Sequence, residues 1–346
     1  MDFSLTDEQN DLLNSLNNTI RNYDDNYWLN CDNSSKYPKE FVDTMAKGGW
    51  LGIAMPTNYG GSNLGVTEAS LMMMLVAEKG GMTAASSIHM NIFGPSSIVK
   101  FASKKQKDSW LPNIINGQSK MCFAVTEPDT GLDTTRLKTK AVKNKGHYLL
   151  NGRKIWTSTA QITNKIMIIA RTSDRNNKTP TEGLSLFYTD FNRDNIEARV
   201  INKMGRAAVD TNELFIDNLK VPIDDIIGEE GKGFSYLIHS LNPERILVAA
   251  EAYGIAKNAL ERAVKYANER IVFDRKIGKN QSIQHPLADA WAKLESLKLL
   301  ILKAANLYDN DLPCGVESNA AKYLAAEYGM EICKQAIATH GGMGYA

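Results

Sequence analysis

The sequence has few cysteines, no long apolar run and almost no net charge. Its four cysteines are scattered without a C-x-x-C pair, and at least Cys122 and Cys333 have apolar neighbours. This favours reduced, buried thiols over disulfides or a metal site, and therefore an intracellular protein. The 40 Lys and Arg residues nearly balance the 39 Asp and Glu residues, which argues against nucleic acid or an anionic membrane as a partner.

Targeting signals and several catalytic motifs are also missing. The segment Met1–Ser4 has neither a basic nor an apolar signal region, and no run is long enough to cross a membrane. We therefore expect a soluble, cytoplasmic protein. The sequence contains no H-E-x-x-H or G-x-S-x-G motif, no Walker loop and no strand-anchored G-x-G-x-x-G. These absences exclude zinc proteolysis, serine hydrolysis and nucleoside triphosphate hydrolysis.

The hydrophobic pattern changes its period twice along the chain. Residues 1–120 show helical spacing, which begins with a capping box at Thr6 and Gln9. Residues 121–230 contain short β-type runs between turn residues, typical of a compact antiparallel sheet. Residues 231–346 return to helical spacing. We therefore predict a mainly α protein in three parts: an N-terminal helical domain, a middle β-domain and a C-terminal helical domain.

The predicted elements can be given by their residues. The strands are Phe123–Val125, Tyr148–Leu150, Lys165–Ala170, Leu184–Tyr188, Ile196–Ile201 and Glu213–Ile216. The long helices are the Met-rich Ala69–Lys79 and, in the last part, Leu241–Phe273, Gln284–Asn306 and Glu317–Thr339.

The first candidate site begins at the edge of the middle domain. The run Met121–Val125 predicts a buried strand that breaks into Thr126-Glu127-Pro128-Asp129. Pro128 has no N–H and ends the strand, and Gly131 permits a positive φ and a close approach of the backbone to a bulky group. The segment therefore suits either a grip on a polar cofactor or an ordinary surface turn.

A second candidate segment follows it. We predict a hairpin turn at Asn151-Gly152, after the Tyr148–Leu150 strand. On the returning strand, Trp156 and Ser158 are two residues apart and are expected to point to the same face. An indole beside a hydroxyl could cover a planar ring and hydrogen-bond its edge. The alternative is a buried tryptophan with a satisfied serine.

These two segments resemble the flavin-binding core of the acyl-CoA dehydrogenase family. The order of helices, sheet and helices extends that resemblance over essentially the whole chain. It implies an antiparallel β-barrel-like middle domain, a C-terminal helical bundle and FAD held between the two strands. The residues it implies as FAD contacts there are Phe123, Val125, Thr126, Trp156 and Ser158, with the Ser158 hydroxyl at flavin N5.

The resemblance also implies FAD contacts in the C-terminal domain, made across a subunit boundary. Arg270 matches the arginine that reaches the FAD pyrophosphate of a neighbouring subunit, where a guanidinium forms two parallel hydrogen bonds. Phe273 and Gln281 match adjacent contacts, and Gly341 and Gly342 belong to the Gly-Gly-x-Gly segment. We therefore expect a homotetramer or a homodimer. The alternative for Arg270 is an exposed cation near a helix C-terminus.

The reaction of the family requires a carboxylate base in a dry pocket. Most members carry this glutamate beyond the Gly-Gly-x-Gly segment, but here the sequence ends at Ala346. The branch with isovaleryl-CoA and long-chain dehydrogenases carries it before an arginine, which implies Glu244 as the base and places Pro243 in the first turn of a helix. Glu251 is the next candidate. The non-catalytic alternative for Glu244 is a helix-start acid paired with Arg245.

The substrate contacts and the departures from the family pattern follow from the same resemblance. Asn242 and Arg245 are implied to lie near the acyl-CoA, and Leu132 stands at a substrate contact where many members have Ser. Asp274 replaces the usual Gly, and Ala338 stands where a Gln commonly meets the cofactor. Because the usual C-terminal segment is missing, we expect that the sequence is a fragment of a longer protein.

We therefore predict an FAD-dependent dehydrogenase that converts an acyl-CoA to its trans-2-enoyl-CoA and passes electrons to an electron-transfer flavoprotein. One alternative is a flavin monooxygenase or acyl-CoA oxidase of the same fold. Another is a flavin-free scaffold that has lost its activity. The length and branching of the acyl chain depend on the floor of a pocket, which the sequence does not show.

Overall fold

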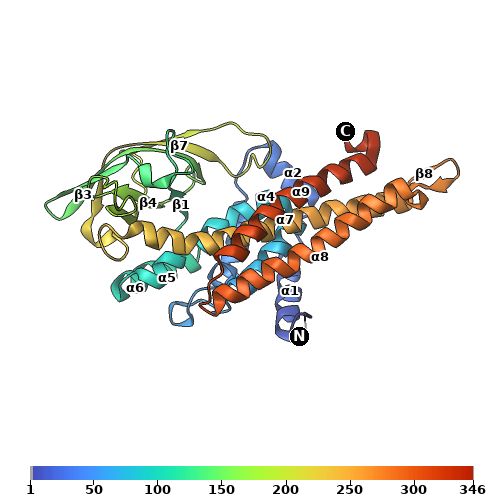
Figure 1. The fold of residues 1–346 in the computed structure, drawn as a ribbon, viewed down its shortest axis with the longest axis horizontal. Coiled ribbons are helices and arrows are strands. Elements are labelled where there is room, and N and C mark those ends of the chain that lie inside the picture. Colours follow the sequence, from blue (N-terminus) through green and yellow to red (C-terminus); the bar gives the residue numbers. More distant parts are fainter. Residues whose placement is uncertain (1–2, 346) are drawn as a thin grey trace. The chain divides into compact units, whose positions relative to one another are not determined.

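The fold is seen in a computed structural model that describes residues 3–345. The expectations on a signal region at Met1 and on the chain end at Ala346 concern residues outside this range. The chain divides into two compact units. Unit 1 comprises Met1–Asp25, Gly65–Ala85 and Asn242–Ala346, and unit 2 comprises Asn26–Leu64 and Ser86–Leu241. Along the sequence the order is helices, a curled sheet and helices, as predicted (Figure 1).

The N-terminal part is helical, as its spacing predicts. The capping box is confirmed, because Gln9 N donates to Thr6 Oγ1 and Thr6 N donates to Gln9 Oε1, both at 3.2 Å. The Met-rich helix extends beyond the predicted Ala69–Lys79 segment and continues through a non-helical residue at Gly81. The helices are α1 (Asp7–Ile20), α2 (Asp25–Asn33), α3 (Lys39–Lys47), α4 (Val66–Phe93), α5 (Ser96–Phe101) and α6 (Lys104–Ile115), with short 3₁₀ segments at Trp50–Gly52 and Thr57–Tyr59.

The middle part forms a seven-stranded sheet in the order β1-β4-β2-β3-β7-β6, and β5 pairs with β4. Most pairs are antiparallel, but β1 runs parallel to β4, so the sheet is not antiparallel throughout. The short strand β2 was not predicted. The strands are β1 (Met121–Ala124), β2 (Lys140–Asn144), β3 (His147–Ser158), β4 (Lys165–Arg171), β5 (Leu184–Asp190), β6 (Ile196–Val200) and β7 (Thr211–Pro222).

The predicted hairpin turn at Asn151-Gly152 is wrong. Strand β3 runs without interruption through both residues, and its pairing with β7 shifts between Leu150 and Gly152, as in a β-bulge. An added Cβ at Gly152 would lie 2.4 Å from Thr139 Oγ1, so the glycine serves a close approach of side chain to backbone. The actual turn joins β2 to β3 at Lys145 and Gly146, which both have positive φ (24° and 86°), as mirror-image hairpin turns require.

Strand β4 is buried on both faces and separates two parts of the core of unit 2. Met167 and Ile169 pack with Trp110 and other residues of the helices in unit 2. Ile166 and Ile168 pack on the opposite side, in a cluster formed mainly by the other strands. Because neighbouring residues of a strand point to opposite faces, a continuous apolar run is what such a position requires.

The C-terminal part contains the three predicted long helices, with bounds that differ at their starts. They are α7 (Gly233–Glu269), α8 (Gln281–Asp309) and α9 (Gly315–His340), and α8 and α9 run side by side (Figure 1). The basic interruption between α7 and α8 is a small hairpin of β8 (Ile271–Val272) and β9 (Arg275–Lys276). A 3₁₀ turn at Gly341–Gly344 follows α9.

Candidate active site

The structure brings the two candidate flavin segments together within unit 2. The chain leaving β1 runs beside the second half of β3, because Ile155 N donates to Thr126 O at 2.9 Å. Phe123 in β1 is half-buried and packs edge-on against Phe93, with ring centroids 5.2 Å apart. Trp156 follows Ile155 directly, so the indole lies next to the point where Val125 and Thr126 leave the sheet.

The backbone at Trp156 changes the expected alternation of side chains. Trp156 has a φ of 62°, and the register of β3 with β7 shifts between Lys154 and Thr157. The regular strand that placed Trp156 and Ser158 on one face is therefore interrupted. The Trp156 side chain is 60% exposed, whereas Ser158 is 8% exposed. The alternative of a buried tryptophan is wrong.

A cation that the site prediction did not include contacts the Ser158 hydroxyl. The guanidinium of Arg206 donates to Ser158 Oγ at 3.4 Å, to Thr211 Oγ1 at 3.1 Å and to Ser86 Oγ at 3.0 Å. Arg206 itself has a positive φ of 52°. Its sequence neighbours include Gly205, and a basic residue beside a glycine in a turn after a strand was the available signal.

A buried ion pair supports the same region from below. Lys154 Nζ lies 3.0 Å from Glu127 Oε1 and also donates to the carbonyl oxygen of Val125 at 2.9 Å. Burial lowers the pKa of Lys154 to about 8, although Glu127 opposes the shift. Burial acts to raise the pKa of Glu127, but the charge of Lys154 and hydrogen bonds from Thr139 and Lys138 outweigh it and lower that pKa. Lys154 shares the parity of Tyr148 and Leu150, so its inward direction could have been read from the sequence.

The predicted base does not lie at a helix start. Helix α7 begins at Gly233, so Pro243 and Glu244 are both interior to it. The proposed first-turn position of Pro243 and the effect of the helix dipole on Glu244 are therefore wrong. The sequence of unbroken helical spacing before Pro243 extends the helix, and the proline only removes the hydrogen bond that its N–H would donate to His239 O. Glu244 is half-buried.

The residues around Glu244 in unit 1 are arranged as follows. Arg245 donates to Asn242 Oδ1 at 3.3 Å, and both side chains are half-buried. The structure thus joins the two predicted acyl-CoA contacts. Glu251, the second candidate base, is fully buried in the same helix at 1% exposure.

The predicted FAD contacts of the C-terminal part lie on exposed segments of unit 1. Arg270 precedes β8 and is exposed, Phe273 is the tip of the β8–β9 hairpin at 93% exposure, and Gln281 opens α8. Gly341 and Gly342 are exposed in the 3₁₀ turn after α9. An exposed arginine and an exposed aromatic at the end of a long helix pair leave these groups available to a second molecule.

The loop after β1 is the most open part of the predicted site. Leu132 is fully exposed. Gly131 does not adopt the positive φ that the sequence permits, and an added Cβ there would meet no described atom within 4 Å. The turn is closed instead by Glu127 and Thr130, whose backbone groups exchange hydrogen bonds of 3.1 and 3.0 Å.

Comparison with known families decides the identity of the fold. The N-terminal, middle and C-terminal domain models of acyl-CoA dehydrogenases match residues 6–118, 122–219 and 231–346. The chain belongs to the acyl-CoA dehydrogenase family. It is therefore an oxidoreductase of that family, and FAD is its cofactor.

Similar curated proteins include two reductases and a dehydrogenase. The chain is 34% identical to the caffeyl-CoA reductase-Etf complex subunit CarC of Acetobacterium woodii, over 91% of this chain and 82% of that protein. It is 35% identical to the 3-(aryl)acrylate reductase of Clostridium sporogenes, over 91% and 83%. It is 33% identical to an acyl-CoA dehydrogenase of Bacillus subtilis, over 91% and 82%.

Solved structures of acyl-CoA dehydrogenases superimpose on the whole chain. Butyryl-CoA dehydrogenase from Megasphaera elsdenii is 30% identical, with a TM-score of 0.95 over 100% of this chain and 91% of that one. A glutaryl-coenzyme A dehydrogenase in complex with glutaryl-CoA is also 30% identical, with a TM-score of 0.94 over 100% and 88%. The FAD complex of PigA is 25% identical, with a TM-score of 0.93 over 100% and 90%.

The residues of this acyl-CoA dehydrogenase fit an isoalloxazine ring. A flat aromatic surface is available at Trp156, and the hydroxyl of Thr126 forms no hydrogen bond within residues 3–345. Ser158 and Arg206 add polar groups to the same region of unit 2. A planar, polar-edged ring needs such a combination of apolar cover and edge partners.

Two further searches covered residues 3–345. None of the described helices is both long and apolar enough to cross a membrane. In the same residues, no group of three or more His, Cys, Asp or Glu side chains is arranged to hold a metal ion. The four cysteines have free thiols, and all but Cys333 are buried.

Proposed function

We propose that this acyl-CoA dehydrogenase removes the α and β hydrogens of an acyl-CoA thioester and gives the trans-2-enoyl-CoA, with Glu244 as the base. The observation that carries the proposal is the exposed Trp156 indole beside Thr126 and Ser158, in a chain that matches all three domains of the family. When bound, FAD supplies the acceptor for the hydride that leaves the β-carbon.

In the proposed mechanism, unit 1 supplies the groups that handle the substrate. The Glu244 carboxylate takes the α-proton, and the neighbouring Asn242 and Arg245 side chains bind polar parts of the acyl-CoA. Their mutual hydrogen bond of 3.3 Å keeps the guanidinium in one orientation beside the base. A carboxylate on a buried helix is held more firmly than one on a loop, and this favours proton transfer at a fixed position.

Unit 2 supplies the groups that orient the ring. Phe123, Val125 and Thr126 would contact it from the first segment, while Trp156 covers it and Ser158 hydrogen-bonds its edge at N5. The Arg206 guanidinium already engages the Ser158 oxygen, so the Ser158 O–H is left to donate. Leu132, at the open loop after β1, would contact substrate without a hydroxyl group.

The remaining proposed FAD contacts require a second copy of the chain. Arg270 would bind the pyrophosphate of the FAD in a neighbouring subunit, with Phe273, Gln281, Gly341 and Gly342 near it. Large apolar side chains of α8 and α9 are exposed in the single chain, which is typical of an interface; they are Trp291, Leu299, Tyr323, Met330 and Ile337. We therefore propose a homotetramer or homodimer, to be tested by light scattering of the purified protein.

A second candidate function is the reverse reaction. Two relatives at 34% and 35% identity are named as reductases of CoA or acrylate compounds, and one is a subunit of a complex with Etf. Protonated Glu244 would then deliver its proton to the α-carbon of an enoyl-CoA, while the β-carbon receives the hydride. In either direction we propose an electron-transfer flavoprotein as the electron partner.

The deciding experiment follows the flavin absorbance near its visible maximum under anaerobic conditions. Wild type is mixed with saturated acyl-CoAs of different length and branching, and with an aryl-substituted acyl-CoA. Glu244→Gln keeps the size and polarity of the side chain but cannot take a proton. We expect wild type to bleach and Glu244→Gln to bind the acyl-CoA without bleaching, whereas Glu251→Gln bleaches as wild type does.

Three results would overturn parts of this proposal. Equal bleaching by wild type and Glu244→Gln removes Glu244 as the base, and loss in Glu251→Gln alone would assign that role to Glu251. Rapid oxygen consumption with formation of hydrogen peroxide would indicate an oxidase. A purified chain that retains no FAD when FAD is added would be a scaffold.

A further inference from the structure

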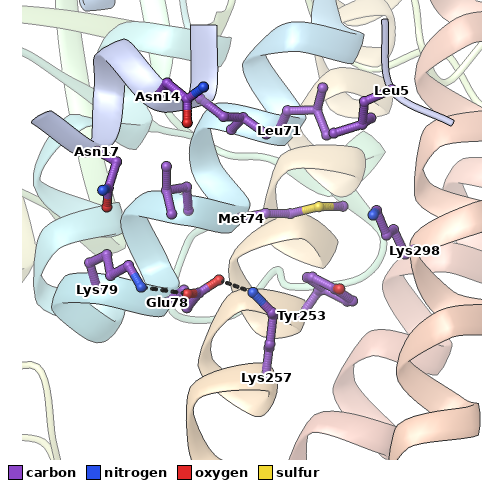
Figure 2. A pocket seen from close by; sticks show the side chains of 12 residues that line it. Leu5, Asn14, Asn17, Leu71, Met74, Glu78, Lys79, Tyr253, Lys257 and Lys298 are labelled. Atoms are coloured by element: carbon purple, nitrogen blue, oxygen red, sulfur yellow. Dashed lines mark hydrogen bonds and ion pairs between the residues drawn. The ribbon is translucent and has the colours of Figure 1, made fainter. Parts of the chain in front are cut away.

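Unit 1 contains a pocket that the proposed dehydrogenation does not use. It lies among α1, α4, α7 and α8 and has a volume of about 260 Å³. Figure 2 shows side chains from all four helices pointing into it. None of the residues that line it belongs to the proposed FAD or acyl-CoA contacts. Ligand pockets usually start near 300 Å³, so this one suits a small ligand.

One wall of the pocket is apolar. Leu13 of α1 and Leu71 and Met74 of α4 line it, and the two α4 side chains are buried. Figure 2 shows Leu71 and Met74 on the side of the pocket that faces α1. Such a wall binds hydrocarbon and offers nothing to a fully hydrated ion.

The opposite wall carries a neutralised carboxylate. Glu78 is 7% exposed, and its two oxygens accept from Lys79 Nζ at 2.7 Å and from Lys257 Nζ at 2.5 Å. Burial acts to raise the pKa of Glu78, but the two lysines outweigh it and lower that pKa. Glu78 therefore stays ionised, and its charge is offset by two ammonium groups. The triad is a net positive support rather than a site for a cation.

Two polar groups of the pocket have no partner. Within residues 3–345, neither the Lys298 ammonium nor the Tyr253 hydroxyl forms a hydrogen bond or an ion pair. Lys298 is half-buried, and Figure 2 shows its nitrogen turned toward Met74. Burial raises the pKa of Tyr253 to about 12, so its hydroxyl remains a hydrogen-bond donor. A half-buried ammonium beside a methionine lacks the solvation and the counter-charge that it usually has.

We propose that this pocket binds a small organic monocarboxylate with an apolar body of about six to eight carbons or one aromatic ring. The carboxylate would accept from Lys298 and Tyr253, and the body would lie on Leu13, Leu71 and Met74. Three lysines against one carboxylate repel cations, and the apolar wall distinguishes a fatty or aryl acid from inorganic phosphate. This proposal does not rest on the proposed reaction.

The test measures binding of octanoate to the full chain with FAD added, by isothermal titration calorimetry. We expect Lys298→Met to weaken binding about tenfold or more and Lys298→Glu to abolish it, whereas Lys298→Arg keeps it. Lys322→Met, on an exposed position of α9, is the control and should bind as wild type does. Octylamine and inorganic phosphate should not bind at this site. Circular dichroism confirms that each variant is folded.

Two outcomes would overturn the proposal. If octanoate binds equally to wild type and Lys298→Met, and acyl-CoA displaces it, the acid occupies the active site and not this pocket. If phosphate binds as tightly as octanoate, the lysines are only a site of nonspecific anion attraction. Both outcomes leave the proposed dehydrogenation intact, because that proposal is tested separately by bleaching of the flavin in Glu244→Gln.

Discussion

Lys154 Nζ lies 3.0 Å from Glu127 Oε1, and the two side chains are 0% and 6% exposed. The pair joins the segment that leaves β1 to the second half of β3. Glu127 also accepts from the backbone N–H groups of Lys138 and Thr139, at 2.6 and 2.9 Å. The exit of β1, where Val125 and Thr126 are proposed to contact the flavin, is therefore held by a buried charge as well as by the sheet.

Removing the cation of this pair should destabilise the protein strongly. Lys154→Met leaves the Glu127 carboxylate buried without its counter-charge, which typically costs about 3–5 kcal/mol. We expect that loss in the free energy of unfolding, measured by urea denaturation. The double variant Lys154→Met/Glu127→Gln removes both charges and should recover part of the loss. A cost below about 1 kcal/mol for Lys154→Met would show that Glu127 is adequately held by its other hydrogen bonds.

Much of the fold follows from local patterns in the sequence, and the errors arise where a distant partner decides. The capping box at Thr6 and the long C-terminal helices depend on residues a few positions apart, and both were predicted correctly. The Asn151-Gly152 turn was not, because β7 pairs along both sides of it and absorbs the extra residue as a bulge. The start of α7 was missed because Pro243 was read as a helix start.

The candidate site shows the same division. The types and spacing of Trp156 and Ser158 identified the region, but the left-handed backbone of Trp156 depends on the register of β3 against β7. The ion pair of Lys154 with Glu127 and the contacts of Arg206 join residues far apart in the sequence, which no local pattern links. These supporting contacts were therefore missed, although the residues that they support were named.

The exposed indole gives a direct test of the proposed flavin contact. Trp156→Ala removes the aromatic cover, and we expect the fraction of purified protein that retains FAD to fall by tenfold or more. Trp156→Phe keeps a flat apolar ring and should retain most of the FAD. Because the side chain is 60% exposed in the chain alone, neither substitution should change the free energy of unfolding of the flavin-free protein by more than about 0.5 kcal/mol. Equal FAD retention by the three proteins would exclude the contact.

Asp225 gives a test of stability against pH. Burial raises the pKa of Asp225 above its ordinary value of 3.8, although a hydrogen bond from Thr189 and the charge of Lys165 oppose the shift. A carboxyl whose pKa is higher in the folded state binds more protons folded than unfolded. Between pH 3.8 and the raised pKa, this group therefore makes stability fall as the pH rises.

Asp225→Asn should reverse that effect, because the amide is neutral at every pH. We expect the variant to be more stable than wild type near pH 7, by less than about 1 kcal/mol, and the difference to vanish below pH 3.8. Urea denaturation of both proteins at a series of pH values measures it. The exposed Asp224, whose pKa is lowered by its hydrogen bond to Lys105, is the control, since Asp224→Asn should not stabilise the protein near pH 7.

The tip of the β8–β9 hairpin gives a local test of backbone strain. Phe273 and Asp274 have φ values of 51° and 58°, as a two-residue mirror-image turn requires, and glycine adopts this region without the steric cost that a side chain carries. The resemblance to the family places Gly where this chain has Asp274, and the positive φ explains that preference. The left-handed region costs an ordinary residue about 1–2 kcal/mol, and Asp less.

Asp274→Gly should therefore stabilise the hairpin by about 0.5–1 kcal/mol, and Asp274→Val should destabilise it. Because the hairpin is exposed and can open without the rest of the protein, hydrogen exchange measured by mass spectrometry on a peptide covering residues 268–280 is the proper readout. We expect slower exchange in Asp274→Gly and faster exchange in Asp274→Val. Asp311 has a similar φ of 53° in another loop, so Asp311→Gly controls for the glycine itself and should leave this peptide unchanged. Faster exchange in Asp274→Gly would mean that the Asp274 side chain stabilises the turn by more than its backbone strain costs.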